Sequence, residues 1–202
     1  MSRAGERIYI EGSAGRIETV VDLPDSPPRG AALVAHPHPL YGGTLDNKVV
    51  QTLAKAFVDL GYVSLRPNFR GVGASEGTHD EGRGETEDLL RVVAHAKEAF
   101  GELPLVLAGF SFGAAVQTQV AQRAAPERVV LVGVAVGRFP SETVPPDTIV
   151  IHGEVDETVP LARVLDWARP QALPVVVIPG ADHFFHLRLN LIKRIVKSSW
   201  RS

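Results

Sequence analysis

The sequence feature best suited to covalent chemistry is a serine enclosed by glycines, Gly109-Phe110-Ser111-Phe112-Gly113. An apolar segment typical of a buried strand, Leu105–Ala108, precedes it, and a segment that predicts a helix, Ala114–Arg123, follows it. At such a strand-to-helix turn the serine takes a strained backbone conformation, and the glycines let strand and helix approach closely. The helix N-terminus favours negative charge on a bound carbonyl oxygen. The pattern predicts Ser111 as a nucleophile.

A serine hydroxyl needs a neighbouring base before it can act as a nucleophile at neutral pH, and the chain offers a histidine and an acid. Asp156 follows the apolar segment Thr148–His152, and His183 follows the next apolar segment, Val175–Ile178. The order serine, aspartate, histidine, each in a loop after a strand, is the order that the nucleophile pattern requires. We expect His183 to take the Ser111 proton and Asp156 to hold the imidazole tautomer.

Each of these two roles has rivals nearby. Glu154 and Glu157 flank the aspartate, and His186 lies one helical turn beyond the predicted base. We favour the aspartate over both glutamates and the first histidine over the second. His152, at the end of a buried strand, is expected to be a hydrogen-bonded core histidine.

The first parallel strand, Ala31–Ala35, leads into His36-Pro37-His38-Pro39-Leu40-Tyr41-Gly42-Gly43. One donor for the oxygen of a tetrahedral intermediate is expected to be the Phe112 backbone N–H, and the second should come from this loop. Because proline has no N–H, its two prolines are excluded. His38 is the first candidate and Leu40 the second.

Two features near this loop invite other interpretations. Alternating histidines, His36 and His38, could bind a metal, but no further ligands cluster at suitable spacing, so we predict neither a metal site nor a cofactor.

The segment Arg70-Gly71-Val72-Gly73-Ala74-Ser75 predicts a tight loop at the same sheet edge. A phosphate site there is disfavoured, since no helix begins directly after it.

Short β-branched segments alternate with helical patterns along the chain, which is typical of a mostly parallel twisted sheet with helices on both faces. The predicted N-terminal antiparallel hairpin is Arg7–Glu11 with Arg16–Leu23, and the other strands are Ala31–Ala35, Tyr62–Pro67, Leu105–Ala108, Val129–Val136, Thr148–His152 and Val175–Ile178. The predicted helices are Asn47–Leu60, Glu85–Phe100, Ala114–Arg123, Leu161–Arg169 and Phe184–Trp200, the last with an inner stripe of Leu187, Leu191, Ile192 and Ile195.

Only Gly137–Asp147 separates two of the predicted strands, which is too short for a helical lid. The pocket should therefore be shallow and open, and we expect short or activated esters to be preferred over long acyl chains.

The composition predicts one globular domain over residues 1–202, with 45% hydrophobic and 22% charged residues. A formal net charge of −2 gives no reason to expect nucleic acid or an anionic membrane as a partner. The absence of cysteine excludes disulfides, thiolate metal sites and a cysteine nucleophile.

No segment resembles a signal peptide or a membrane span, so we expect a cytoplasmic protein. The oligomeric state, a homodimer included, is left open.

Several of these motifs together resemble a family of small, lidless bacterial serine hydrolases related to the dienelactone hydrolases. The shared segments are His36–Pro39, Gly42–Thr44, Asp46–Val50, Asn68–Gly73, Gly109–Ala114, Gly153–Val159 and Asp182–His186. The resemblance implies an α/β-hydrolase fold and carboxylesterase-type activity on small esters, with Ser111, Asp156 and His183 at the triad positions. Dienelactone hydrolase itself has a cysteine at the position of Ser111, so dienelactone is not the expected substrate.

The leading hypothesis is a serine hydrolase that cleaves small carboxylic esters through an acyl-enzyme on Ser111, with a small-molecule ester as its partner. An acyltransferase or perhydrolase would use the same triad with an acceptor other than water. A non-catalytic binding protein on the same fold would usually show a broken triad, whereas this one is complete.

Overall fold

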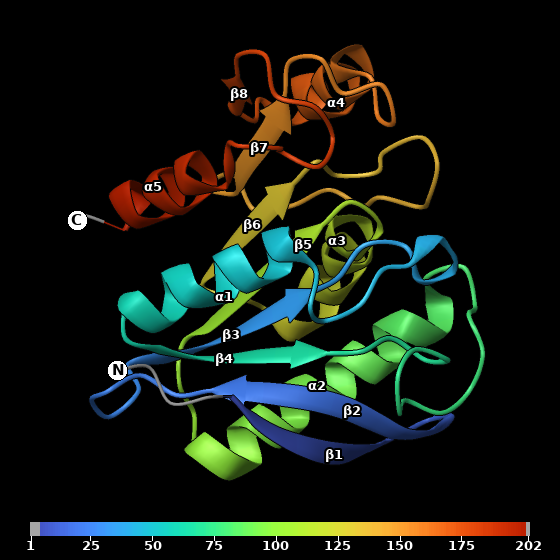
Figure 1. Cartoon of the computed structure of the whole chain (residues 1–202), viewed down its shortest axis with the longest axis vertical. Coiled ribbons are helices and arrows are strands. Elements are labelled where there is room, and N and C mark those ends of the chain that lie inside the picture. Colours follow the sequence, from blue (N-terminus) through green and yellow to red (C-terminus); the bar gives the residue numbers. More distant parts are fainter. Residues whose placement is uncertain (1–4, 201–202) are drawn as a thin grey trace.

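The structure, a computed structural model, describes residues 5–200 and is built around one eight-stranded sheet (Figure 1). The strands are β1 Glu6–Gly12, β2 Gly15–Asp22, β3 Gly30–Ala35, β4 Tyr62–Pro67, β5 Leu105–Phe110, β6 Arg128–Val132, β7 Ile149–Gly153 and β8 Val175–Ile178. The α-helices are α1 Lys48–Asp59, α2 Arg83–Phe100, α3 Phe112–Ala124, α4 Leu161–Ala168 and α5 Leu189–Ser199. Short 3₁₀ turns lie at Pro39–Tyr41 and Arg169–Gln171.

The strand order is β1-β2-β4-β3-β5-β6-β7-β8. The hairpin β1–β2 is antiparallel and β2 also pairs antiparallel with β4, whereas all pairs from β4 to β8 are parallel. The expected α/β-hydrolase fold, with its N-terminal hairpin and mostly parallel sheet, is confirmed.

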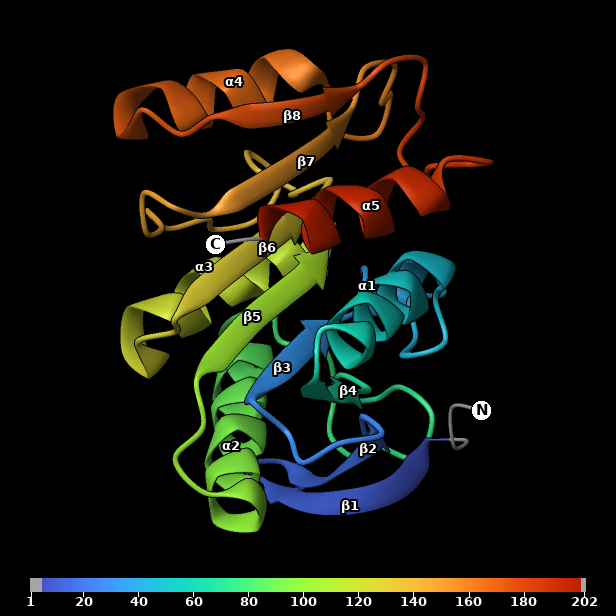
Figure 2. The same ribbon diagram turned by 90° about the vertical axis from the view of Figure 1, so that its left-hand side faces the viewer.

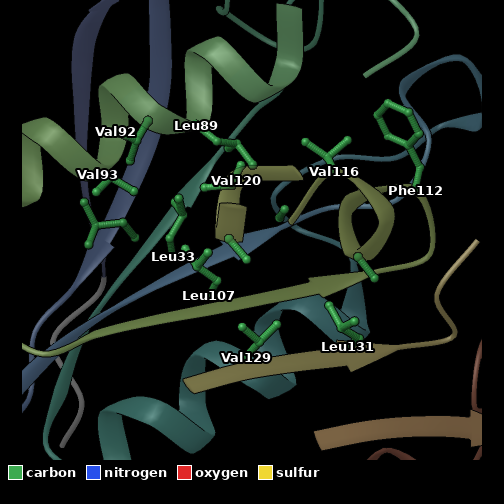
Figure 3. Close-up of a cluster of buried hydrophobic side chains, with 14 of the residues drawn as sticks. Leu33, Leu89, Val92, Val93, Leu107, Phe112, Val116, Val120, Val129 and Leu131 are labelled. Carbon is green, nitrogen blue, oxygen red and sulfur yellow. The ribbon is translucent and has the colours of Figure 1, made fainter. Parts of the chain in front are cut away.

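Successive residues of the central strands face opposite sides of the sheet and belong to two separate cores, as the period of a strand requires. Leu33 and Leu107 pack with side chains of α2 and α3 (Figure 3). Val34 and Val106, which alternate with them, pack on the other side with side chains of α1 and α5. Figure 2 shows these two helix layers on either side of the sheet. Because both faces are covered, the central strands are wholly apolar.

Two predicted boundaries are wrong by more than two residues. β6 ends at Val132 rather than Val136, because Gly133 takes a positive φ of 52° and turns the chain out of the sheet. Residues 133–136 continue the apolar sequence of the strand although they are outside it, because most of them are buried in the core.

The terminal helix begins at Leu189 rather than Phe184, since Phe185 and Leu187 both have positive φ values that interrupt a helix. Leu187 is therefore not part of an inner stripe: it is 95% exposed. The buried residues of α5 are Ile192 and Val196, with Leu191 and Ile195 packed beside them.

The segment between β6 and β7, residues 133–148, contains no helix, so nothing in it forms a lid over the sheet edge. Within the described residues, no helix combines the length and apolar character needed to cross a membrane.

The crossing of β5 and α3 has no room for side chains at two glycines. A Cβ on Gly109 would lie 2.6 Å from the backbone of Gly113 and Ala114. A Cβ on Gly113 would collide with the carbonyl oxygens of Ala35 and His36 at the end of β3. These close approaches confirm the predicted purpose of the two glycines and bring the start of α3 onto the neighbouring strand.

We predict that Gly113→Ala destabilises the protein by about 3 kcal/mol, because two rigid backbone carbonyls cannot move away from the new methyl group. In an unhindered helix the same change would stabilise by up to about 1 kcal/mol. Urea denaturation measures the difference. The control is Gly42→Ala, where a Cβ meets nothing within 4 Å and only the positive φ of 80° opposes the substitution. An unchanged or higher free energy of unfolding for Gly113→Ala would contradict the close packing.

Candidate active site

The carboxyl ends of the parallel strands meet at one edge of the sheet, and the loops that follow them carry the predicted functional residues. The loop that begins at His36 follows β3, and Ser111 follows β5 directly. Asp156 lies three residues after β7, and His183 lies five residues after β8. Parallel pairing therefore brings together side chains that are far apart in the sequence, as expected for ligand sites of open α/β sheets.

Ser111 has the strained backbone that its sequence pattern predicts, with φ 56° and ψ −117°. Hydrogen bonds on both sides hold this conformation. The Ser111 N–H donates to Val132 O at 2.9 Å, and its carbonyl accepts from the N–H groups of Ala115 at 3.1 Å and Ala135 at 3.3 Å. The nucleophile candidate is thus tied to the end of β6, to α3 and to the loop after β6.

A continuous hydrogen-bond chain joins three side chains at this edge. Ser111 Oγ lies 3.0 Å from His183 Nε2, and His183 Nδ1 lies 2.6 Å from Asp156 Oδ2. An ionised carboxylate can only accept, so Nδ1 carries the hydrogen and Nε2 is free to accept the serine proton. All three residues are buried, with Ser111 8% exposed at the floor of a cavity. The arrangement can deprotonate an alcohol for attack on an electrophile.

The Asp156 carboxylate is fixed by its own loop. Its Oδ1 accepts from the Val159 N–H at 2.7 Å, and His152 Nε2 donates to the Val159 carbonyl at 2.8 Å. His152 is fully buried, as expected for a core histidine, and burial lowers its pKa. Only Nε2 is hydrogen-bonded, however, and within residues 5–200 the Nδ1 atom has no partner. His152 therefore fixes the loop that carries Asp156, in addition to filling the core.

The rival residues lie outside this chain of contacts. Glu154 is exposed and accepts from the Gly180 N–H at 2.8 Å, and Glu157 is exposed as well. His186 is exposed on the surface and bonds to Asp182, whose pKa it lowers through that hydrogen bond. The structure places none of these three side chains beside Ser111.

Two backbone N–H groups at this sheet edge have no hydrogen-bond acceptor among residues 5–200. Phe112 is the first residue of α3, so its N–H has no partner within the helix. The His38 N–H makes no hydrogen bond with any described residue, while the His38 carbonyl is fixed by the N–H groups of Tyr41 at 3.2 Å and Gly43 at 3.0 Å. Leu40, the second candidate, donates its N–H to His38 Nδ1 at 3.2 Å. His38 is therefore favoured over Leu40 as a donor.

His36 is a structural residue rather than a metal ligand. Its Nε2 accepts from the Phe69 N–H at 2.9 Å, so the hydrogen is on Nδ1, which donates to the Pro37 carbonyl at 2.7 Å. Burial lowers the pKa of His36 to about 4, and the imidazole is therefore neutral at pH 7. Among the described residues no three His, Asp or Glu side chains are grouped in a way that could hold a metal. The buried ring joins the loop after β3 to the loop after β4.

Arg70, in the second glycine-containing loop, has a different partner. Its guanidinium binds both carboxylate oxygens of Asp88 on α2, each at 2.8 Å. It does not line the Ser111 cavity, and it anchors its loop to the helix layer.

The cavity above Ser111 has a volume of about 400 Å³. Sequence reasoning gave no role to several side chains in its walls, among them Tyr41, Asn47, Arg138, Phe139, Thr158 and Phe184. They lie in segments without a periodic pattern, and the only sequence signal for Asn47, Thr158 and Phe184 is that they belong to the motif segments.

A strained serine, a histidine and a buried aspartate at the carboxyl edge of this sheet define the class of α/β serine hydrolases. The chain belongs to the family described as serine aminopeptidase, S33, which it matches over residues 28–184.

Solved structures and a curated relative agree with this class. A lidless α/β serine hydrolase from Xanthomonas campestris has a TM-score of 0.93 and 33% identity, covering 100% of this chain and 95% of that one. An α/β serine hydrolase homologue from Coxiella burnetii has a TM-score of 0.88 and 35% identity, covering 99% and 98%. An uncharacterized protein from Rickettsia prowazekii is 35% identical over 215 residues, 94% of this chain and 86% of its own length.

We predict that the His36 imidazole does not titrate between pH 8 and pH 5, because its pKa is about 4. The unfolded chain, in which His36 has its ordinary pKa of 6.5, binds more protons in this range. The free energy of unfolding should therefore fall as the pH drops from 6.5 to 4, by about 3 kcal/mol from this residue.

Ring chemical shifts in NMR measure the His36 titration directly. The stability difference between the parent protein and His36→Gln should shrink by a similar amount over the same pH interval. A His36 titration midpoint near 6.5 would show that the ring is not buried as described.

Proposed function

We propose that this chain is a carboxylesterase-type serine hydrolase that cleaves small carboxylic esters through an acyl-enzyme on Ser111. The observation that carries the proposal is the hydrogen-bond chain from Ser111 Oγ through His183 to Asp156 at the floor of an open cavity. The cavity volume of about 400 Å³ suits a small ester, and the segment 133–148 adds no lid to enclose a larger one.

In the proposed reaction, Ser111 Oγ attacks the ester carbonyl while its proton moves to His183 Nε2. Asp156 stabilises the charged imidazolium through the Nδ1 hydrogen bond. The Phe112 and His38 N–H groups donate to the oxyanion of the tetrahedral intermediate. The intermediate then expels the alcohol, which takes the proton back from His183 and leaves an ester on Ser111. A water molecule, deprotonated by the same imidazole, hydrolyses that ester and regenerates the serine.

We predict that a fluorophosphonate probe labels the native protein and that Ser111→Ala abolishes labelling. Ester turnover should fall by about 10⁶-fold in Ser111→Ala and in His183→Ala, because each removes part of one reacting unit. Asp156→Asn should be less damaging, at about 10⁴-fold, since the base and the nucleophile remain. Mass spectrometry of the labelled peptide and kcat/KM on p-nitrophenyl acetate provide the measurements.

Glu157→Gln is a matched control for Asp156→Asn, because Glu157 is an exposed carboxylate of the same loop, and its turnover should be unchanged. A folded native protein that neither labels nor turns over esters would refute the proposal and favour a binding protein.

We predict that His38→Pro lowers kcat by about 10²- to 10³-fold, because it removes one donor to the oxyanion. The φ of −56° at His38 already suits proline, so the backbone can keep its path. His38→Ala is the control: it removes the imidazole but keeps the N–H, and we expect kcat within about tenfold of the parent value. Thermal unfolding verifies that both variants are folded. Equal losses in the two variants would assign the role to the side chain instead.

A further inference from the structure

One wall of the cavity at Ser111 carries a permanent positive charge. Arg138 lies in the segment between β6 and β7, and its side chain lines the same cavity as Ser111 and His183. It is the only Lys, Arg, Asp or Glu among the residues that line this cavity. A single unopposed charge in a wall of otherwise neutral and aromatic side chains is a feature that a substrate can match.

The backbone of Arg138 has a fixed relation to the nucleophile. The Ala135 N–H donates to the Ser111 carbonyl, and the N–H groups of Arg138 and Phe139 both donate to the Ala135 carbonyl at 3.3 Å. The Phe139 ring packs against Phe112, with centroids 4.7 Å apart. The loop after β6 is thus folded against the start of α3, and Arg138 is positioned by the same contacts that hold Ser111.

The guanidinium of Arg138 has unused hydrogen-bonding capacity. With the described residues it makes one hydrogen bond, from Nη1 to the Thr158 carbonyl at 3.3 Å. Arg66 and Arg70, by contrast, form ion pairs with Asp22 and Asp88. In the part of the chain that the structure describes, no carboxylate lies within 4 Å of Arg138. A guanidinium has five N–H donors in a planar fork that matches the two oxygens of a carboxylate.

Arg138 also lies near the loop that carries His38, because the His38 ring packs against Phe139 with centroids 5.1 Å apart. Burial and the neighbouring His79 lower the pKa of His38, Glu81 and Glu85 act to raise it, and Arg138 makes the smallest contribution, which lowers it. The guanidinium therefore acts electrostatically on another residue of the cavity lining.

We propose that Arg138 binds a carboxylate of the substrate, so that the preferred substrates are small esters that also carry a carboxylate, such as the monoesters of short dicarboxylic acids. This inference rests on the proposed esterase function and narrows its substrate class. Binding the remote carboxylate would hold the ester carbonyl beside Ser111, so the benefit should appear in kcat/KM.

The experiment compares two series of methyl esters of equal size. One series contains the monomethyl esters of succinate, glutarate and adipate. In the other series the methyl ester is kept and a neutral carboxamide replaces the free carboxylate. Three chain lengths are needed to find the spacing between Arg138 and Ser111. We expect kcat/KM for the best monoester to exceed that for its amide by about tenfold. The rate of methanol release measures the hydrolysis.

Variants test whether the charge of Arg138 sets the substrate preference, or whether any disturbance of its loop would do so. Arg138→Gln should lower kcat/KM for the best monoester by about tenfold and leave the amide within about twofold, and Arg138→Glu should reverse the preference. Arg163→Gln is the matched control, because Arg163 lies on α4 beside Phe139 but lines a different surface hollow and also has no carboxylate within 4 Å among the described residues. It should retain the preference of the parent protein.

A second readout does not depend on turnover. Glutarate, present in excess, should slow fluorophosphonate labelling of the parent protein and of Arg163→Gln but not of Arg138→Gln. The inference is wrong if monoesters and amides react equally in the parent protein, or if Arg138→Gln slows both equally. If the native protein neither labels nor hydrolyses any ester, the proposed function is wrong as well.

Discussion

The site depends on how closely the start of α3 approaches the ends of β3 and β5. Gly109 and Gly113 have no side chains, so the backbone of the helix can lie against the carbonyls of Ala35 and His36. This contact forces Ser111 into a positive φ and leaves the N–H of Phe112 without an intrahelical acceptor. The strain at one residue is maintained because hydrogen bonds from three segments hold it in place.

Other polar groups at this sheet edge are fixed by backbone contacts within or between the loops. The His38 carbonyl, the Asp156 carboxylate and the His36 ring each bind backbone N–H groups nearby. Each contact gives a polar group a partner within the protein, so the polar groups at this sheet edge are largely satisfied. Groups fixed in this way would suit the electrostatic stabilisation of an oxyanion that the proposed esterase reaction requires.

Where sequence reasoning failed, the cause was local. The apolar segment Val129–Val136 has the composition of a single strand, yet a positive φ at Gly133 ends β6 at Val132. The residues beyond it stay apolar because they pack over α3. Leu187 continues the spacing of an amphipathic helix, but the turns at Phe185 and Leu187 leave its side chain in solvent. Composition reports that a residue can be buried, not which element buries it.

By itself the sequence determined the alternation of strands and helices, the strained turn at Ser111 and the order of the three side chains, because these are properties of adjacent residues and of strand periodicity. Only the tertiary structure decided that His183 rather than His186 contacts Ser111. It also decided that the Leu40 N–H is occupied, whereas the His38 N–H has no acceptor in the described part of the chain. It also placed Arg138 in the cavity wall. These outcomes depend on the paths of loops that meet across the sheet, and no periodic pattern in the chain encodes the distance between them.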